Sequence, residues 1–233
     1  MDSREIIFSS IRRSLGVTGT EAGRRAAVAE RLEKHPPGLV PARGQQAQRL
    51  PLFRRMVELA AGTVAEVPSQ DAVPAAVASF LRAHNLPSRF RRGSDPRLEA
   101  MPWARERNLD ISTGPSDGND LVALSHAFGA AAETGTLLMT SGPDNPTTLN
   151  FLPDTHIVVV DAKDIAGDYE AVWARLRERY GAATMPRTVN WITGPSRSAD
   201  IEQTLILGAH GPRRLHIIVV GGEPAESGTK TAP

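Results

Sequence analysis

The feature that most constrains the fold of this chain is a pair of nearly continuous apolar runs, HIVVV at 156–160 and LHIIVV at 215–220. Runs of this kind, rich in β-branched residues, are typical of strands that are covered on both faces, as in parallel sheets. Helical patterns at 48–61, 71–84 and 168–180 alternate with further strand candidates at 63–67, 89–90, 121–125, 136–140 and 189–193. The alternation predicts an α/β fold, an αβα sandwich with a mainly parallel sheet.

The first 46 residues differ from the rest of the chain. Ser3 is placed to cap a helix that begins at Arg4 and ends at Gly16, and a weaker helical pattern covers 19–34. Residues 35–46 hold three prolines and two glycines, a composition typical of an irregular linker. The sequence therefore predicts an N-terminal helical arm and linker at 1–46, an α/β domain at 47–222 and a flexible tail at 223–233, with the arm peripheral to the core.

Composition excludes several classes of function. The chain has no cysteine, so it cannot supply thiols to a disulfide, an iron–sulfur cluster or a zinc site. Its six histidines (35, 84, 126, 156, 210 and 216) show no paired metal-ligand spacing, and we expect no bound metal or other cofactor. The apolar runs are far shorter than the ~18 residues of a membrane span. The N-terminus lacks the apolar core of a secretory signal, which predicts a cytoplasmic protein.

Charge is unevenly distributed along the chain. The net charge is +1, but residues 1–55 hold 11 Lys and Arg against 5 Asp and Glu. These arginines alternate with apolar residues at helical spacing, and no series of aromatic residues accompanies them. The pattern favours an exposed basic face or a surface for a protein partner, and nucleic-acid binding is not expected.

The familiar nucleotide and protease motifs are absent, and three polar segments remain as candidates for chemistry. The first is Glu133-Thr134-Gly135-Thr136, in which a carboxylate and two hydroxyls flank a glycine between apolar stretches. A buried Glu133 suits a general acid or base, with Thr134, Gly135 and Thr136 as ligand contacts. The alternative is a structural Glu133 that accepts backbone N–H groups at a tight turn where Gly135 takes a positive φ.

The second and third segments are rich in donors. Around Gly194, Ser196, Arg197 and Ser198 a strand ends at a Gly-Pro turn and a helix is predicted to start near Ser198. The N–H groups at such a helix start favour an anion, although Ser198 as an ordinary N-cap explains the pattern equally well. The third segment, 208–214, presents His210 for proton transfer and Arg213 for a carboxylate, or a merely structural histidine.

Four stretches together, ETGTLLM (133–139), LNFLPDTHIVVV (149–160), ITGPSRSADIE (192–202) and LILGAHGPRRLHIIVV (205–220), resemble the LUD-domain family. The resemblance implies a Rossmann-like αβα sandwich similar to the sugar-isomerase/CoA-transferase fold. It also implies a role beside iron–sulfur partner proteins in oxidising L-lactate to pyruvate. The loop 142–148 lacks an arginine that family members often carry before the Leu-Pro of the next strand.

These observations predict a non-redox accessory subunit with one cleft for a small anionic ligand such as lactate or pyruvate. The catalytic candidates are Glu133 and His210, and the ligand-binding candidates are Thr134, Gly135, Thr136, Gly194, Ser196, Arg197, Ser198 and Arg213. The alternative is a stand-alone transferase or ligase-like enzyme acting on a small carboxylate or phosphorylated substrate.

Overall fold

The computed structural model describes residues 2–36, 38–40, 48–181, 184–199 and 205–221. The chain divides into two compact units, Met1–Val40 and Pro41–Pro233. The predicted tail at 223–233 and the linker segment at 41–46 lie outside the described residues.

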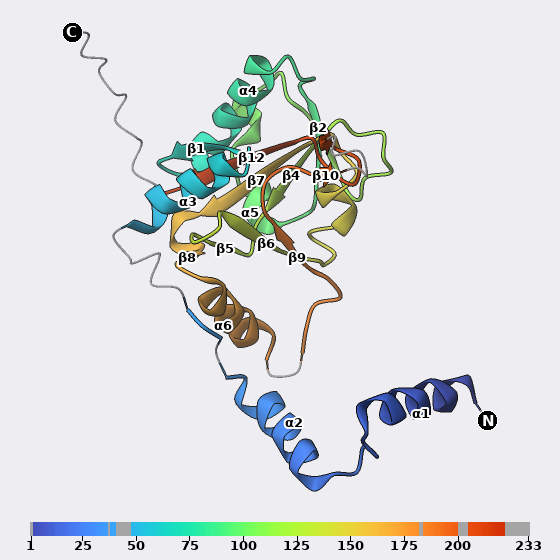
Figure 1. Cartoon of the computed structure of the whole chain (residues 1–233). Helices are drawn as coiled ribbons and strands as arrows, with labels where there is room; N and C mark the ends of the chain where they lie inside the picture. Colours follow the sequence, from blue (N-terminus) through green and yellow to red (C-terminus); the bar gives the residue numbers. More distant parts are fainter. Residues whose placement is uncertain (1, 37, 41–47, 182–183, 200–204, 222–233) are drawn as a thin grey trace. The chain divides into compact units, whose positions relative to one another are not determined.

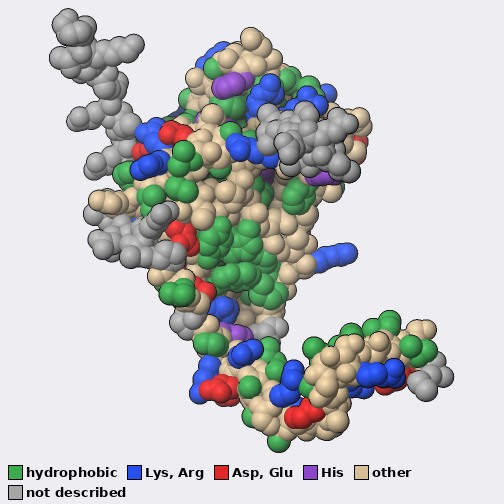
Figure 2. All heavy atoms as spheres, in the orientation of Figure 1, with side chains coloured by type: hydrophobic (Ala, Val, Ile, Leu, Met, Phe, Trp, Pro, Cys, Tyr) green, Lys and Arg blue, Asp and Glu red, His purple; other side chains and the backbone are tan. Residues whose placement is uncertain are grey.

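The first unit consists of two helices, α1 (Ser3–Leu15) and α2 (Ala22–Lys34). Asp2, rather than the expected Ser3, caps α1 by accepting the N–H of Arg4. No described residue of this unit is buried. Hydrophobic side chains lie along the surface of α1, where Ile7 and Leu15 are 59% and 61% exposed (Figure 2).

The second unit is built on a six-stranded parallel sheet with the strand order β1-β12-β7-β4-β2-β3. Its strands are β1 (Thr63–Val67), β12 (Arg214–Val220), β7 (Thr155–Asp161), β4 (Val122–His126), β2 (Arg89–Arg92) and β3 (Asp110–Thr113). The two apolar runs form the neighbouring strands β7 and β12, which are buried on both faces (Figure 1). This arrangement confirms the predicted α/β fold with a parallel sheet.

Helix α4 (Val73–Ala83) covers one face of the parallel sheet. Its apolar side chains, among them Val77 and Leu81, pack with Ile157 and Val159 of β7 and with Ile218 of β12. The short helix α5 (Pro96–Glu99) follows β2 and adds Leu98 to the same core. The burial of these aliphatic side chains is the main stabilising contribution on this face.

A second sheet and one helix cover the opposite face of the parallel sheet. The sheet has the order β8-β5-β6-β9, formed by β8 (Ile165–Ala166), β5 (Gly129–Ala131), β6 (Thr136–Thr140) and β9 (Val189–Ile192). Helix α3 (Arg49–Leu59) and one face of β6 pack on the alternate residues of β7, Val158 and Val160. Helix α6 (Tyr169–Tyr180) covers the outer face of this sheet through Val172 and Leu176 (Figure 1).

The second sheet corrects one expectation. The sequence predicted one mainly parallel sheet. However, β6 and β9, which adjoin the first and second candidate segments, pair antiparallel in the smaller sheet, whereas β12, which adjoins the third, belongs to the parallel one. Apolar runs alone do not distinguish the two sheets, because both are buried between layers.

Candidate functional site

A cleft of about 830 Å³ opens at the carboxyl ends of β2 and β4. Within the parallel sheet, the next strand in the chain after β2 is β3, its neighbour on one side. The next strand of this sheet after β4 is β7, its neighbour on the opposite side. In open α/β sheets this change of direction is where ligands bind, because the loops that leave the two strands separate there. Fifteen residues line the cleft: Asp95, Pro96, Arg97, His126, Phe128, Thr140, Ser141, Gly142, Asp144, Asn145, Asp164, Arg175, Glu178, Arg179 and Tyr180.

Asp95 and Arg97 form a fixed ion pair on the wall that follows β2. Asp95 caps α5 by accepting the backbone N–H of Arg97, and it also accepts the Arg97 Nε and Nη2 at 3.0 and 2.7 Å. Burial acts to raise the pKa of Asp95, but the hydrogen bond and charge of Arg97 outweigh it and hold the pKa below its usual 3.8. Asp95 is therefore ionised, and Arg97 is held in one orientation at the cleft.

His126, the last residue of β4, lies beside this pair and is 2% exposed. Its Nδ1 lies 2.9 Å from the carbonyl oxygen of Ala127, and its Nε2 lies 3.6 Å from Oδ2 of Asp161 without a hydrogen bond. Burial first, and then the charge of Arg97, lower the pKa of His126; Asp95 and Asp161 act in the opposite direction. Ala127 O also accepts from Nη1 of Arg97.

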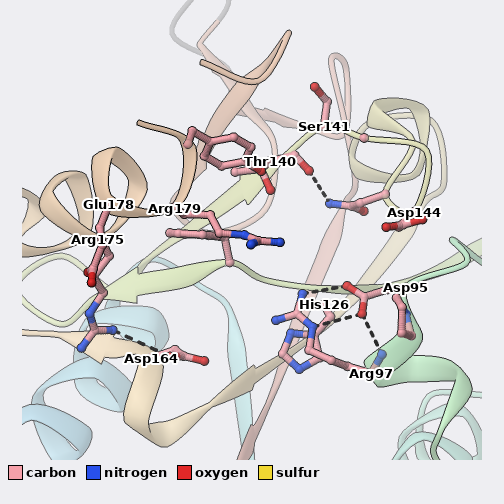
Figure 3. Close-up of a pocket in the computed structure, with 15 residues that line it drawn as sticks. Asp95, Arg97, His126, Thr140, Ser141, Asp144, Asp164, Arg175, Glu178 and Arg179 are labelled. Carbon is pink, nitrogen blue, oxygen red and sulfur yellow. Dashed lines mark hydrogen bonds and ion pairs between the residues drawn. The ribbon is translucent and has the colours of Figure 1, made fainter. Parts of the chain in front are cut away.

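Helix α6 and the loop after β6 form the other walls (Figure 3). Arg175 contacts Asp164 at 3.9 Å and donates to the carbonyl oxygen of Lys163. Arg179 extends from α6 across the cleft toward the side of Asp95 and His126, and it makes no ion pair or hydrogen bond to any other described residue. A free guanidinium at a cleft wall can bind a carboxylate through two parallel hydrogen bonds.

The loop at 141–145 lies close to β2. A Cβ at Gly93 would collide with the carbonyl oxygen of Asp144, so only glycine permits this approach. Asn145 donates to the carbonyl oxygen of Thr140 and fixes the loop. The hydroxyl of Ser141 and the carboxylate of Asp144 are thereby held at the rim.

None of the residues chosen from the sequence lines this cleft. Glu133 is 8% exposed, and its Oε1 accepts the N–H of Tyr169 at the start of α6. Gly135 has a φ of +66°, and a Cβ there would lie 2.5 Å from the backbone N of Val57. This geometry matches the structural alternative, in which Glu133 accepts a backbone N–H beside a glycine with positive φ.

The two threonines beside Glu133 join a cluster of hydroxyl groups. Thr136 Oγ1 lies 2.7 Å from Thr134 Oγ1, 2.8 Å from the Tyr169 hydroxyl and 2.6 Å from Thr193 Oγ1. The contact with Thr193 brings the first candidate segment next to the start of the second. Each hydroxyl of Thr134 and Thr136 already has partners within the chain.

The second and third candidate segments meet each other. The N–H of Ser196 donates to Pro212, and the N–H of Gly208 donates to Ser196. Gly194 has a φ of +69°, and a Cβ there would lie 2.3 Å from the carbonyl oxygen of Ala60. His210 and Arg213 are exposed, and Arg213 Nε lies 3.7 Å from Asp154.

One expectation about these segments is wrong. Instead of a helix that starts near Ser198, residues Arg197–Ala199 form strand β10, which pairs antiparallel with β11 (Leu205–Leu207). Ser198 is therefore not the N-cap of a helix. Residues 200–204, which the expected helix would have included, lie outside the described residues. The catalytic and ligand roles of the ten candidate residues stay predictions.

Sequence reasoning missed Asp95, Arg97, His126 and Arg179. A signal was present for two of them, because Asp95 precedes a proline after a strand, as a helix cap does, and His126 follows the apolar run 121–125. Arg179 gave no signal, since it is one of several arginines on an amphipathic helix. No described helix is long and apolar enough to cross a membrane, and the described residues hold no group of three metal-ligating side chains.

Fold and cleft together define an α/β protein with a cleft at the topological switch of a parallel sheet. A DUF162 family protein from Deinococcus radiodurans has a similar fold, with a TM-score of 0.54 and 24% identity over 76% of this chain and 99% of that one. The LUD domain model matches residues 118–220. Lactate utilization protein C of Deinococcus radiodurans is 32% identical over 209 residues, 84% of this chain and 91% of that protein. The chain belongs to the LUD-domain family.

Other relatives match over shorter segments. Lactate utilization protein C of Geobacillus thermodenitrificans is 39% identical over 90 residues, 38% of each protein. An uncharacterized protein of Neisseria meningitidis is 36% identical over 119 residues, 51% of this chain and 50% of that protein. The matched segments thus span about half or less of the length of these relatives.

Proposed function

We propose that this protein is a non-redox accessory subunit of an L-lactate oxidation system whose partner proteins carry the iron–sulfur clusters, and that its cleft binds a small carboxylate such as lactate or pyruvate. The similarity to relatives named lactate utilization protein C supports a role in the use of lactate. The lack of cysteine supports the proposal that partner proteins carry the clusters, because this chain has no thiolate with which to hold one.

The observation that carries the ligand proposal is the unpaired Arg179 at the cleft wall. Arg97 is engaged by Asp95 and Arg175 contacts Asp164, so Arg179 is the guanidinium available to a carboxylate among the described residues of the cleft.

The charges of the walls disfavour a multiply charged anion. Three arginines and four acidic residues line the cleft, and two of the acids, Asp144 and Glu178, have no ion pair with another described residue. These carboxylates repel a multiply charged anion such as a phosphate ester, whereas one carboxylate is balanced by Arg179. A three-carbon acid fills a small part of 830 Å³, so it would lie against the arginine wall with water in the remaining space.

Calorimetric titration of the full chain with sodium pyruvate and with sodium L-lactate tests this proposal. We expect saturable one-to-one binding of at least one of the two acids. Arg179→Ala should weaken it roughly tenfold or more, the usual loss for a hydrogen bond to a charged group. Arg177→Ala is the matched control, because Arg177 lies on the same helix and does not line the cleft. Absence of binding, or equal loss in both variants, would contradict the proposal.

A further inference from the structure

Both ring nitrogens of His126 face oxygen acceptors. Nδ1 lies 2.9 Å from the Ala127 carbonyl, and Nε2 lies 3.6 Å from the Asp161 carboxylate. A neutral imidazole has one N–H and one lone pair, so in either tautomer one nitrogen presents its lone pair to an oxygen. Only the imidazolium, which donates from both nitrogens, matches these surroundings.

Other features of the site oppose the imidazolium. His126 is buried, and Arg97 places a positive charge beside it, held there by Asp95. The charged groups that act on the ring are Arg97 and Asp95 from the segment after β2 and Asp161 from the end of β7. Burial and Arg97 prevail and lower the pKa of His126, so the ring is neutral at pH 7 and Nε2 makes no hydrogen bond to a described residue.

A carboxylate bound in the cleft changes this balance. Arg179 extends across the cleft toward Asp95 and His126, so a carboxylate held by Arg179 places its negative charge between the two walls and offsets the repulsion between Arg97 and a protonated His126. It also excludes water, which strengthens the attraction of Asp161 for the imidazolium. We propose that the cleft takes up one proton, on His126, when it binds a small monocarboxylate. This inference rests on the proposed function, since it concerns the occupant of the same cleft.

Linkage fixes the sign of the effect. The pKa of free His126 is lowered, and the bound anion raises it, so the complex holds a proton that the free protein lacks. Binding must then strengthen as pH falls, and Kd should rise roughly tenfold per pH unit while the pH lies between the two pKa values. A binding reaction without proton uptake has no such slope once the ligand itself is fully ionised.

Calorimetry in buffers of different ionisation enthalpy measures the uptake. Pyruvate is titrated into the full chain near pH 7 in non-coordinating amine and sulfonate buffers, and the dependence of the heat on buffer ionisation enthalpy gives the number of protons. We expect a value near one for the natural chain. In His126→Asn the value should fall to near zero and binding near pH 7 should weaken, whereas His84→Asn, which alters an exposed histidine outside the cleft, should remain near one.

Nuclear magnetic resonance of the natural chain provides a second measurement if the Asn variant does not fold. With ¹⁵N-labelled histidine, pyruvate should move both ring nitrogens of His126 from neutral to imidazolium shifts. Measurable binding with zero proton uptake and unchanged His126 shifts would overturn this inference and leave the proposed function standing. Proton uptake that persists in folded His126→Asn would overturn the assignment to His126. Failure of pyruvate and lactate to bind at all would overturn both.

Discussion

Acid should destabilise this fold well before its carboxylates are protonated. His156 in β7 and His216 in β12 are buried, and burial lowers their pKa values to about 3 and about 4, with His84 contributing at His216. An unfolded histidine titrates at about 6.5. Because the folded pKa is the lower one, the unfolded chain binds more protons below pH 6.5, and the free energy of unfolding decreases as pH falls through that value.

The size of the effect follows from the two pKa values. From about pH 6.5 to about pH 5, each histidine costs about 1.4 kcal/mol per pH unit, so the pair removes about 4 kcal/mol. Asp95 does not contribute to the loss of unfolding free energy in this pH range. Its pKa lies below 3.8, so its stabilising contribution is lost only in stronger acid. Urea unfolding followed by far-UV circular dichroism at several pH values measures the change. A free energy of unfolding that varies by less than about 1 kcal/mol between pH 7.5 and pH 5 would refute the reasoning.

Three further predictions concern the framework. Glu133→Ala should lower the free energy of unfolding by about 1 kcal/mol in urea, because the hydrogen bond to the Tyr169 N–H is lost. Glu133→Gln keeps an oxygen acceptor and should lower the free energy of unfolding by less. If Glu133 has the catalytic role predicted from the sequence, Glu133→Gln should abolish lactate-dependent growth. Gly135→Ala should cost about 2 kcal/mol or more, since the new Cβ meets the backbone of Val57; Gly16→Ala, at a similar φ of +64° with nothing within 4 Å, is the control and should cost less. Deletion of residues 1–46 should leave cooperative unfolding intact, because no described residue among them is buried; a molten product would contradict this.

Sequence reasoning located most of the regular structure. The strands at 63–67 and 136–140 have the predicted bounds, and 168–180 differs from α6 by one residue. These segments carry strong local signals: β-branched runs, a capping aspartate at 168 and a glycine at 181. The strand at 110–113 was not predicted, since DIST is short and half exposed at the sheet edge.

The candidate site shows where such reasoning ends. Glycines and polar residues in ETGT and TGPS indicated special backbone geometry, and the structure explains it at Gly135 and Gly194 by close packing against α3 and the residue after it. The cleft instead combines Asp95, His126 and Arg179, which lie on three elements whose proximity depends on strand order. Strand order is a property of long-range pairing, and local patterns carry no information about it.

A crystal structure of the protein grown with pyruvate tests the central claim most directly. The account predicts the carboxylate of pyruvate between the Arg179 guanidinium and the wall formed by Asp95, Arg97 and His126. A pyruvate bound instead beside Glu133 or beside His210, with the cleft filled only by water, would contradict it.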